Sequence, residues 1–165
     1  MKDSAEIVNE HAGSRDAMER YILVALFLIE QRWNYIVGRE FLPENITPKQ
    51  WLFLVILGNI FERPPSMQEM AEAMSTTHQN VKQIAVRLEE KGLIRITPDR
   101  DRRILRLETT PRFHEFWSGR DERDRATVES LFESLDDDEV EDLFRIFAKL
   151  EEASKRRYME YRKRR

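Results

Sequence analysis

The sequence predicts a mainly α-helical fold with one small β-hairpin, in which a winged helix-turn-helix is flanked by long N- and C-terminal helices. Two short helices with clear start signals are expected between residues 66 and 91. After Gly92 the apolar residues change from the 3.6-residue period of a helix to the two-residue period of a strand. Longer stretches with helical spacing precede and follow this segment. These three observations together favour a compact DNA-reading unit between two helical arms.

The first short helix is marked by Ser66 and Glu69, which have the Ser-x-x-Glu spacing of a capping box. In such a box each side chain accepts a hydrogen bond from the backbone N–H of the other residue. The helix is expected to run from Met67 to about Met74 and to break at Ser75-Thr76.

The second short helix should start after Thr77, an N-cap residue, and run to Lys91 before Gly92. One of its faces is apolar, with Val81, Ile84, Ala85 and Leu88 at helical spacing. The start of the helix and its opposite face carry the candidate DNA-binding residues Thr77, His78, Gln79, Asn80, Lys82, Gln83 and Arg87.

A β-hairpin is expected next, with strands at residues 93–96 and 104–107 and a polar turn between them. Five arginines lie between Arg95 and Arg106. We take Arg100, Arg102 and Arg103 at the turn as candidate DNA contacts, because a reader of a polyanion needs cations beside its hydrogen-bonding groups.

The N-terminal part, residues 1–45, is expected to hold a loose or partly helical arm followed by a helix that ends near Gly38. Residues 21–29 form a nine-residue run that is apolar on all sides, so this helix should be buried on more than one side. A chain of this size has too few layers to cover it, and a partner subunit is the natural cover. Residues 46–110 are assigned as the DNA-binding region, opened by Thr47, Pro48 and Gln50 as start signals of a helix.

The C-terminal part, residues 111–165, is expected to hold dimerisation helices and a basic tail. One helix should open at Pro111, pass a weak point at Gly119 and continue to Leu135. A second should begin after Asp136, which has Glu139 three residues on as a capping partner. Seven basic residues lie between Lys155 and Arg165, near the end of this helix, where the helix dipole favours cations.

Composition limits the other classes of function. The formal net charge is −3, so the distribution of charge matters more than its total. The chain has no cysteine and three histidines, which argues against disulfides, thiol redox sensing and a metal site. No run approaches the roughly 20 apolar residues that span a bilayer, and no basic leader precedes residues 21–29, so a cytoplasmic protein without membrane association is expected. Nothing resembles a catalytic arrangement or a cofactor site, so we expect neither an enzyme nor a bound cofactor.

These residues resemble the MarR-type winged helix-turn-helix transcriptional regulators, over roughly residues 14–150. The most specific piece is the segment Leu-Glu-Glu-Lys-Gly-Leu-Ile at residues 88–94. Asp101 and Arg103 stand as the family's Asp-x-Arg pair, and Thr110-Pro111 matches its Leu-Thr-Pro position. The sequence departs from the family at Ser75 and Phe113, which both stand where glycine is usual, at Gln83, where Arg is frequent, and at Thr109, where Leu is usual.

The resemblance implies a homodimer whose terminal helices interlock and whose two readers enter successive major grooves of a pseudo-palindromic operator. It also implies a repressor that a small aromatic or phenolic ligand releases from DNA. Candidate residues for such a ligand pocket are the aromatic side chains Trp33, Trp51, Phe53, Phe116 and Trp117, although aromatic residues at helical spacing are more often plain core.

The chemistry of the side chains predicts what the reader recognises. Gln79, Asn80 and Gln83 suit paired hydrogen bonds to adenine N6 and N7, which predicts half-sites that contain A·T pairs. The alternative is a winged-helix module that binds protein and not DNA; such a module would expose apolar residues on its wing.

Overall fold

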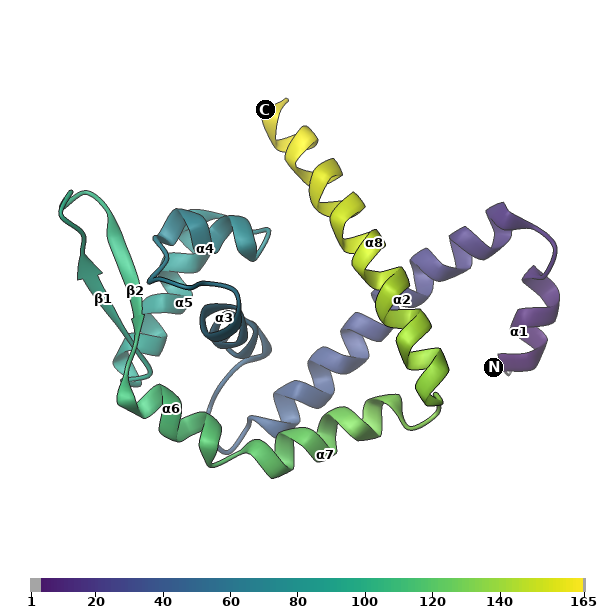
Figure 1. The fold of residues 1–165 in the computed structure, drawn as a ribbon, viewed down its shortest axis with the longest axis horizontal. Coiled ribbons are helices and arrows are strands. Elements are labelled where there is room, and N and C mark those ends of the chain that lie inside the picture. The colour runs from purple at the N-terminus through teal and green to yellow at the C-terminus, as the bar shows by residue number, and fades with distance from the viewer. Residues whose placement is uncertain (1–3, 165) are drawn as a thin grey trace. The chain divides into compact units, whose positions relative to one another are not determined.

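The computed structural model describes residues 4–164, which form a mostly helical chain with one two-stranded antiparallel sheet. The chain falls into two compact units that divide between Val55 and Ile56, and each is described by itself. The elements are α1 (Ser4–His11), α2 (Arg15–Glu40), α3 (Pro48–Asn59), α4 (Met67–Ala73), α5 (His78–Glu90), β1 (Ile94–Pro98), β2 (Leu105–Thr109), α6 (Pro111–Ser118), α7 (Asp121–Phe132) and α8 (Asp137–Lys163) (Figure 1). This confirms the predicted fold class.

The first unit is dominated by α2, which begins after Ser14. The Ser14 hydroxyl accepts a hydrogen bond from Ala17 N–H at 3.3 Å, as an N-cap residue does. The expected partly helical arm is present as α1, and α2 continues two residues beyond the predicted end at Gly38. No residue of α2 is buried in the single chain, and Phe27 in the apolar run is 64% exposed. The apolar residues 21–29, which were predicted to be buried, are therefore largely exposed in the described part of the chain.

The start of α3 follows the predicted signals. Thr47 N–H donates to Gln50 Oε1 at 3.0 Å, and Gln50 N–H donates to Thr47 Oγ1 at 3.3 Å. Gln50 is almost fully buried, so its side chain serves the cap and not the solvent. Phe53 and Leu54, which follow on α3, are completely buried.

The second unit has its core between α4, α5 and the hairpin. Met70 from α4, Val81 and Leu88 from α5, and Leu107 from β2 are completely inaccessible to solvent, and Ile94 from β1 is 2% exposed. On the two helices, apolar residues three or four positions apart lie on one face, and this face is the one that is buried. The capping box of Ser66 and Glu69 is present as predicted.

The hairpin lies one to two residues further along the chain than predicted. In β1, Pro98 pairs with Leu105 instead of lying in the turn. Ile96 N–H points away from β2, toward Glu89 Oε1 at 2.7 Å. Because positions two apart point the same way, the missing N–H of Pro98 also faces outward and costs no hydrogen bond of the ladder.

The predicted helix from Pro111 to Leu135 is wrong, because two helices occupy this stretch. Gly119 caps α6, donating its N–H to Glu115 O at 3.1 Å, and α7 starts after Arg120. The Arg120 backbone lies outside the helical region at φ −121° and ψ −9°, while its buried side chain bonds Asp124 within α7. The sequence marked Gly119 as weak, but the break also depends on the burial of Arg120, which a local pattern does not reveal.

We expect Gly58→Ala to destabilise the protein by about 1–3 kcal/mol, because it overpacks a filled site. A Cβ at Gly58 would lie 2.9 Å from Cζ of Phe113, whose ring is 5% exposed and packs edge-on against Trp117. Denaturant unfolding of Gly58→Ala, alone and with Phe113→Leu, measures the effect. The shorter leucine side chain of the double variant should remove most of the penalty, and full additivity would contradict the contact.

The last helix, α8, begins with the predicted capping box of Asp136 and Glu139. None of its residues is buried in the single chain, and Phe144 is 75% exposed. Its apolar side chains lie along one face at helical spacing, at Val140, Leu143, Phe144, Phe147 and Leu150. Within residues 4–164, no helix combines the length and apolar character that crossing a membrane requires.

Candidate nucleic-acid interface

The second helix of the helix-turn-helix, α5, is fixed by its cap and by its apolar face. Thr77 Oγ1 accepts a hydrogen bond from Asn80 N–H at 3.2 Å, as predicted. Val81, Ala85 and Leu88 are completely buried, and Ile84 is half-buried. The helix is therefore held by one face, and the other face is presented to solvent.

The presented face contains all the predicted side chains of α5. Every one of them is exposed: His78, Gln79, Asn80, Lys82, Gln83 and Arg87. Asn80 Nδ2 donates to Thr76 Oγ1 at 3.1 Å, so this amide is partly engaged with the turn. Within the described chain, the Gln79 and Gln83 amides make no hydrogen bond, and their i, i+4 spacing places them side by side. These two amides are the ones most available to pair with base edges.

The two helices of the helix-turn-helix, α4 and α5, end in the same hydrogen-bonded motif. At the end of α4, Thr76 N–H bonds Ala71 O and Ser75 N–H bonds Glu72 O; at the end of α5, Leu93 N–H bonds Leu88 O. This Schellman pattern requires a positive φ at the residue after the C-cap. Gly92 supplies it at φ +72°, whereas at α4 it is Ser75 at φ +50°. The turn after α4 thus has a left-handed backbone at Ser75, a residue that carries a side chain.

We expect Ser75→Gly to stabilise the protein by about 0.5–1 kcal/mol, because glycine adopts a positive φ without the steric cost that a Cβ brings. Thermal unfolding should show Tm rising by about 2–4 °C per kcal/mol. Gly92→Ser is the matched control and should destabilise by a similar amount, since a Cβ there meets Arg112 only at 3.6 Å, an ordinary contact. A lower Tm for Ser75→Gly would contradict the assignment of strain.

The wing tip, residues 99–103, presents three arginines to solvent, as predicted. Arg103 is 89% exposed, but its Nε and Nη2 bind the two carboxylate oxygens of Asp101 at 3.1 and 3.0 Å. These bonds hold the pKa of Asp101 below its usual value and raise the pKa of Arg103. Within the described chain, no ion pair engages Arg100 or Arg102. The tip therefore has one arginine that is ion-paired within the turn and two exposed arginines, Arg100 and Arg102, that are not.

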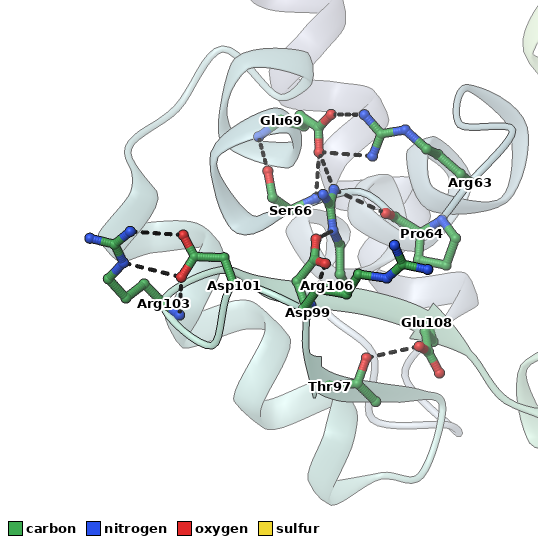
Figure 2. Close-up of polar contacts among 11 residues, drawn as sticks. Arg63, Pro64, Ser66, Glu69, Thr97, Asp99, Asp101, Arg103, Arg106 and Glu108 are labelled. Carbon is green, nitrogen blue, oxygen red and sulfur yellow. Dashed lines mark hydrogen bonds and ion pairs between the residues drawn. The ribbon is translucent and has the colours of Figure 1, made fainter.

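The base of the wing carries an ion network that the sequence did not reveal (Figure 2). Arg106 on β2 binds Asp99 Oδ2 through Nε at 2.6 Å and Glu69 Oε2 through Nη1 at 2.9 Å. Glu69 also binds Arg63, through Oε1 at 2.5 Å. We call these four residues, Arg63, Glu69, Asp99 and Arg106, the wing-anchor cluster. In the sequence, Arg106 is only one of five arginines between Arg95 and Arg106.

Glu69 has two tasks in this arrangement, since it caps α4 and joins the wing-anchor cluster. Ser66 N–H donates to its Oε2 at 2.7 Å. This backbone hydrogen bond, followed by the bond from Arg63, lowers the pKa of Glu69 to about 2. The carboxylate stays ionised throughout the physiological range. The capping box was visible in the sequence, whereas the partner 37 residues away on β2 was not.

The five aromatic candidates for a ligand pocket occupy different environments. Phe53 is completely buried. Trp51 packs against Phe41 with ring centroids 6.2 Å apart, and Trp33 is 37% exposed. Phe116 and Trp117 meet edge to face at 5.2 Å. A ligand pocket formed by these aromatic residues stays a prediction.

Residues 44–104, from the loop before α3 to the wing tip, match the sequence model of the MarR family. Within this segment the winged helix-turn-helix is similar in sequence to the MarR family.

Solved MarR structures extend the likeness beyond the matched segment. A MarR protein from Peptoclostridium difficile superimposes with a TM-score of 0.75 at 17% identity, covering 85% of this chain and 91% of its own. The transcriptional regulator BldR from Sulfolobus solfataricus gives 0.73 at 22% identity, covering 85% and 99%. A further MarR structure gives 0.69 at 25% identity, covering 82% and 98%. The fold of the flanking helices is thus shared with MarR proteins as well as that of the reader.

Proposed function

We propose that this MarR-type chain is a homodimeric regulator that binds double-stranded DNA in a sequence-specific manner. The observation that carries the proposal is the exposed polar face of α5, held by a buried apolar face and flanked by the unpaired arginines Arg100 and Arg102. Residues 46–110 supply the reader, and residues 1–45 and 111–165 supply the dimer contacts.

In the proposed complex α5 lies in the major groove and the wing approaches the adjacent minor groove. Gln79 and Gln83 pair with adenine edges, and Lys82 and Arg87 neutralise phosphates. One of the tip arginines enters the minor groove, where the negative potential is strongest at narrow A-tracts. Exposed apolar side chains at the tip would instead favour a protein partner, but this tip is made of charged residues.

The dimer follows from the uncovered helices at both ends of the chain. Leu23, Val24 and Phe27 on α2 are each more than half exposed, as are Phe144 and Ile146 on α8. Such a concentration of large apolar side chains on exposed helix surfaces marks an interaction surface. A second copy of the chain covers them in a symmetric interface, which also places two readers about one helical turn apart, near 10 bp.

The proposed mode of action is repression, relieved when a small aromatic or phenolic ligand binds. Titration with phenolic acids while tryptophan fluorescence is recorded tests the ligand, since Trp33, Trp51 and Trp117 are all among the candidates. Absence of quenching at millimolar concentrations would remove ligand release from the proposal and leave DNA binding untouched.

The deciding experiment is selection of bound fragments from random DNA, followed by affinity measurement at several salt concentrations. We expect a pseudo-palindrome with A·T-containing half-sites about 10 bp apart. With roughly four phosphate contacts in each half-site, the slope of log K against log salt should be near −7. No enriched sequence, or a slope shallower than about −3, would contradict a two-reader complex.

A further inference from the structure

The wing-anchor cluster joins two parts of the reader that are distant in sequence. Arg106 leaves β2 and reaches Glu69 on α4 at 2.9 Å, and its Nη1 also approaches Pro64 O at 3.4 Å. Next to these contacts, Leu107 N–H donates to Pro65 O at 2.9 Å, so backbone and side chain hold β2 against the segment that precedes α4. The outer edge of the wing is therefore fixed at its base.

The same arginine controls where the wing tip begins. Asp99 is the first residue after β1, and it accepts from Arg106 Nε at 2.6 Å while its other oxygen accepts from Arg100 N–H. Beyond it, Asp99 N–H bonds Ile104 O at 2.9 Å and closes the turn. The direction in which Arg100 and Arg102 project therefore depends on a chain of contacts that starts at Glu69.

The cluster is balanced in charge and partly withdrawn from solvent. It contains two arginines and two carboxylates, and the side chains of Arg106 and Asp99 are 24% and 26% exposed. Ionisation of both carboxylates is favoured, since hydrogen bonds from Arg106 and from Arg100 N–H lower the pKa of Asp99 as well. An arginine already bound to two carboxylates is poorly placed to attract a phosphate, in contrast to the unpaired Arg100 and Arg102.

We propose that Arg106 is a positioning residue for DNA binding, which holds Asp99 against Glu69 so that the wing tip presents Arg100 and Arg102 to the duplex, and that it makes no DNA contact itself. This inference rests on the proposed function. It assigns a different role to Arg106 than to Arg100 and Arg102, which lie four to six residues before it in the same hairpin.

The first test asks whether removing a negative charge at Glu69 weakens or strengthens DNA binding. Glu69→Gln removes a negative charge from the reader, which by electrostatics alone should strengthen binding to a polyanion. Gln still completes the capping box, so α4 keeps its start. We expect binding to weaken instead, by about fivefold, because the wing loses its anchor. Glu90→Gln, at an exposed position of α5 with the same change in charge, should bind equally or more tightly. Tighter binding by Glu69→Gln would overturn the proposal.

The second test is a double-mutant cycle. Arg106→Gln should weaken DNA binding about tenfold in the parent, but less than about twofold in a chain that already carries Arg100→Ala and Arg102→Ala. A direct contact between Arg106 and DNA, or a general loss of stability, would give the same factor in both backgrounds and would overturn the proposal. Arg106→Lys should recover only part of the affinity, because one ammonium group cannot bridge both carboxylates as the guanidinium fork does.

A third measurement needs no DNA. In the free protein, hydrogen exchange at Asp99 and Ile104 should become faster in Arg106→Gln, while exchange in α5 should not change. Arg95→Gln, which removes an exposed cation from β1, is the matched control and should leave the tip amides protected. Unchanged exchange at the tip would overturn the anchoring role. If the parent did not bind DNA at all, the proposed function would fail, and this measurement would still decide whether the cluster fixes the wing.

Discussion

Phe144→Asp is expected to convert the dimer into a monomer and to weaken operator binding by about 100-fold or more. The Phe144 side chain is 75% exposed in the single chain and lies on the apolar face of α8. Burying a carboxylate in a subunit interface costs several kcal/mol when it has no partner. A monomer also loses the gain from binding two half-sites at once, which reaches about 10²–10⁴-fold for linked readers.

Sedimentation at micromolar concentrations and gel shifts on the selected operator measure both effects. Lys149→Asp is the control, since it changes the charge by two units on the opposite face of α8 and should leave the dimer intact. The folding of the variant chain is checked by its helical circular dichroism, which should persist because Phe144 supports little within one chain. A dimeric Phe144→Asp protein would show that α8 does not form the interface. A parent chain that is monomeric at micromolar concentration would refute the dimer itself.

Gln83→Ala is expected to remove discrimination at one or two base pairs, by about 1–3 kcal/mol or roughly 5–150-fold. The Gln83 amide is exposed, makes no hydrogen bond within the described chain, and lies one turn from Gln79 on the exposed face of α5. Its loss should not change the number of phosphate contacts, so the salt slope should stay the same.

Affinities for the operator and for single base-pair variants of it give the result directly. Gln68→Ala serves as the control, because Gln68 is an exposed glutamine of α4 whose amide bonds Glu72 within its own helix. It should leave the preference at every base pair unchanged. If Gln83→Ala retained the full preference of the parent, the assignment of α5 as the recognition helix would need revision, although the fold would stand.

The features that the sequence predicted well are those in which cause and effect lie within a few residues. Ser66 with Glu69 and Asp136 with Glu139 form the predicted capping boxes, and Thr77 caps α5. Each of these signals works through side chains that bond backbone groups three positions away. The buried face of α5 was likewise readable from its apolar spacing, with Val81, Ala85 and Leu88 fully enclosed.

The features that it missed depend on the environment. The stretch after Pro111 has helical spacing on both sides of Gly119, and the separation of α6 from α7 involves the buried Arg120 as well as Gly119. Phe53 had the same pattern as the other aromatic candidates, but only the structure showed that its side chain is completely buried. The period of the apolar residues identifies which face of a helix is apolar, but it does not identify the residues that pack against that face.

The sequence by itself determined the kind of molecule: two capped short helices, a hairpin rich in arginine, and longer helices with apolar residues toward both ends. Only the tertiary structure separated the arginines of the hairpin by role, with Arg106 bound to Glu69 and Asp99 while Arg100 and Arg102 remain unpaired. The physical reason is distance along the chain. Caps and amphipathic faces arise from neighbours, whereas an ion pair between α4 and β2 exists only once folding has brought residues 37 positions apart into contact.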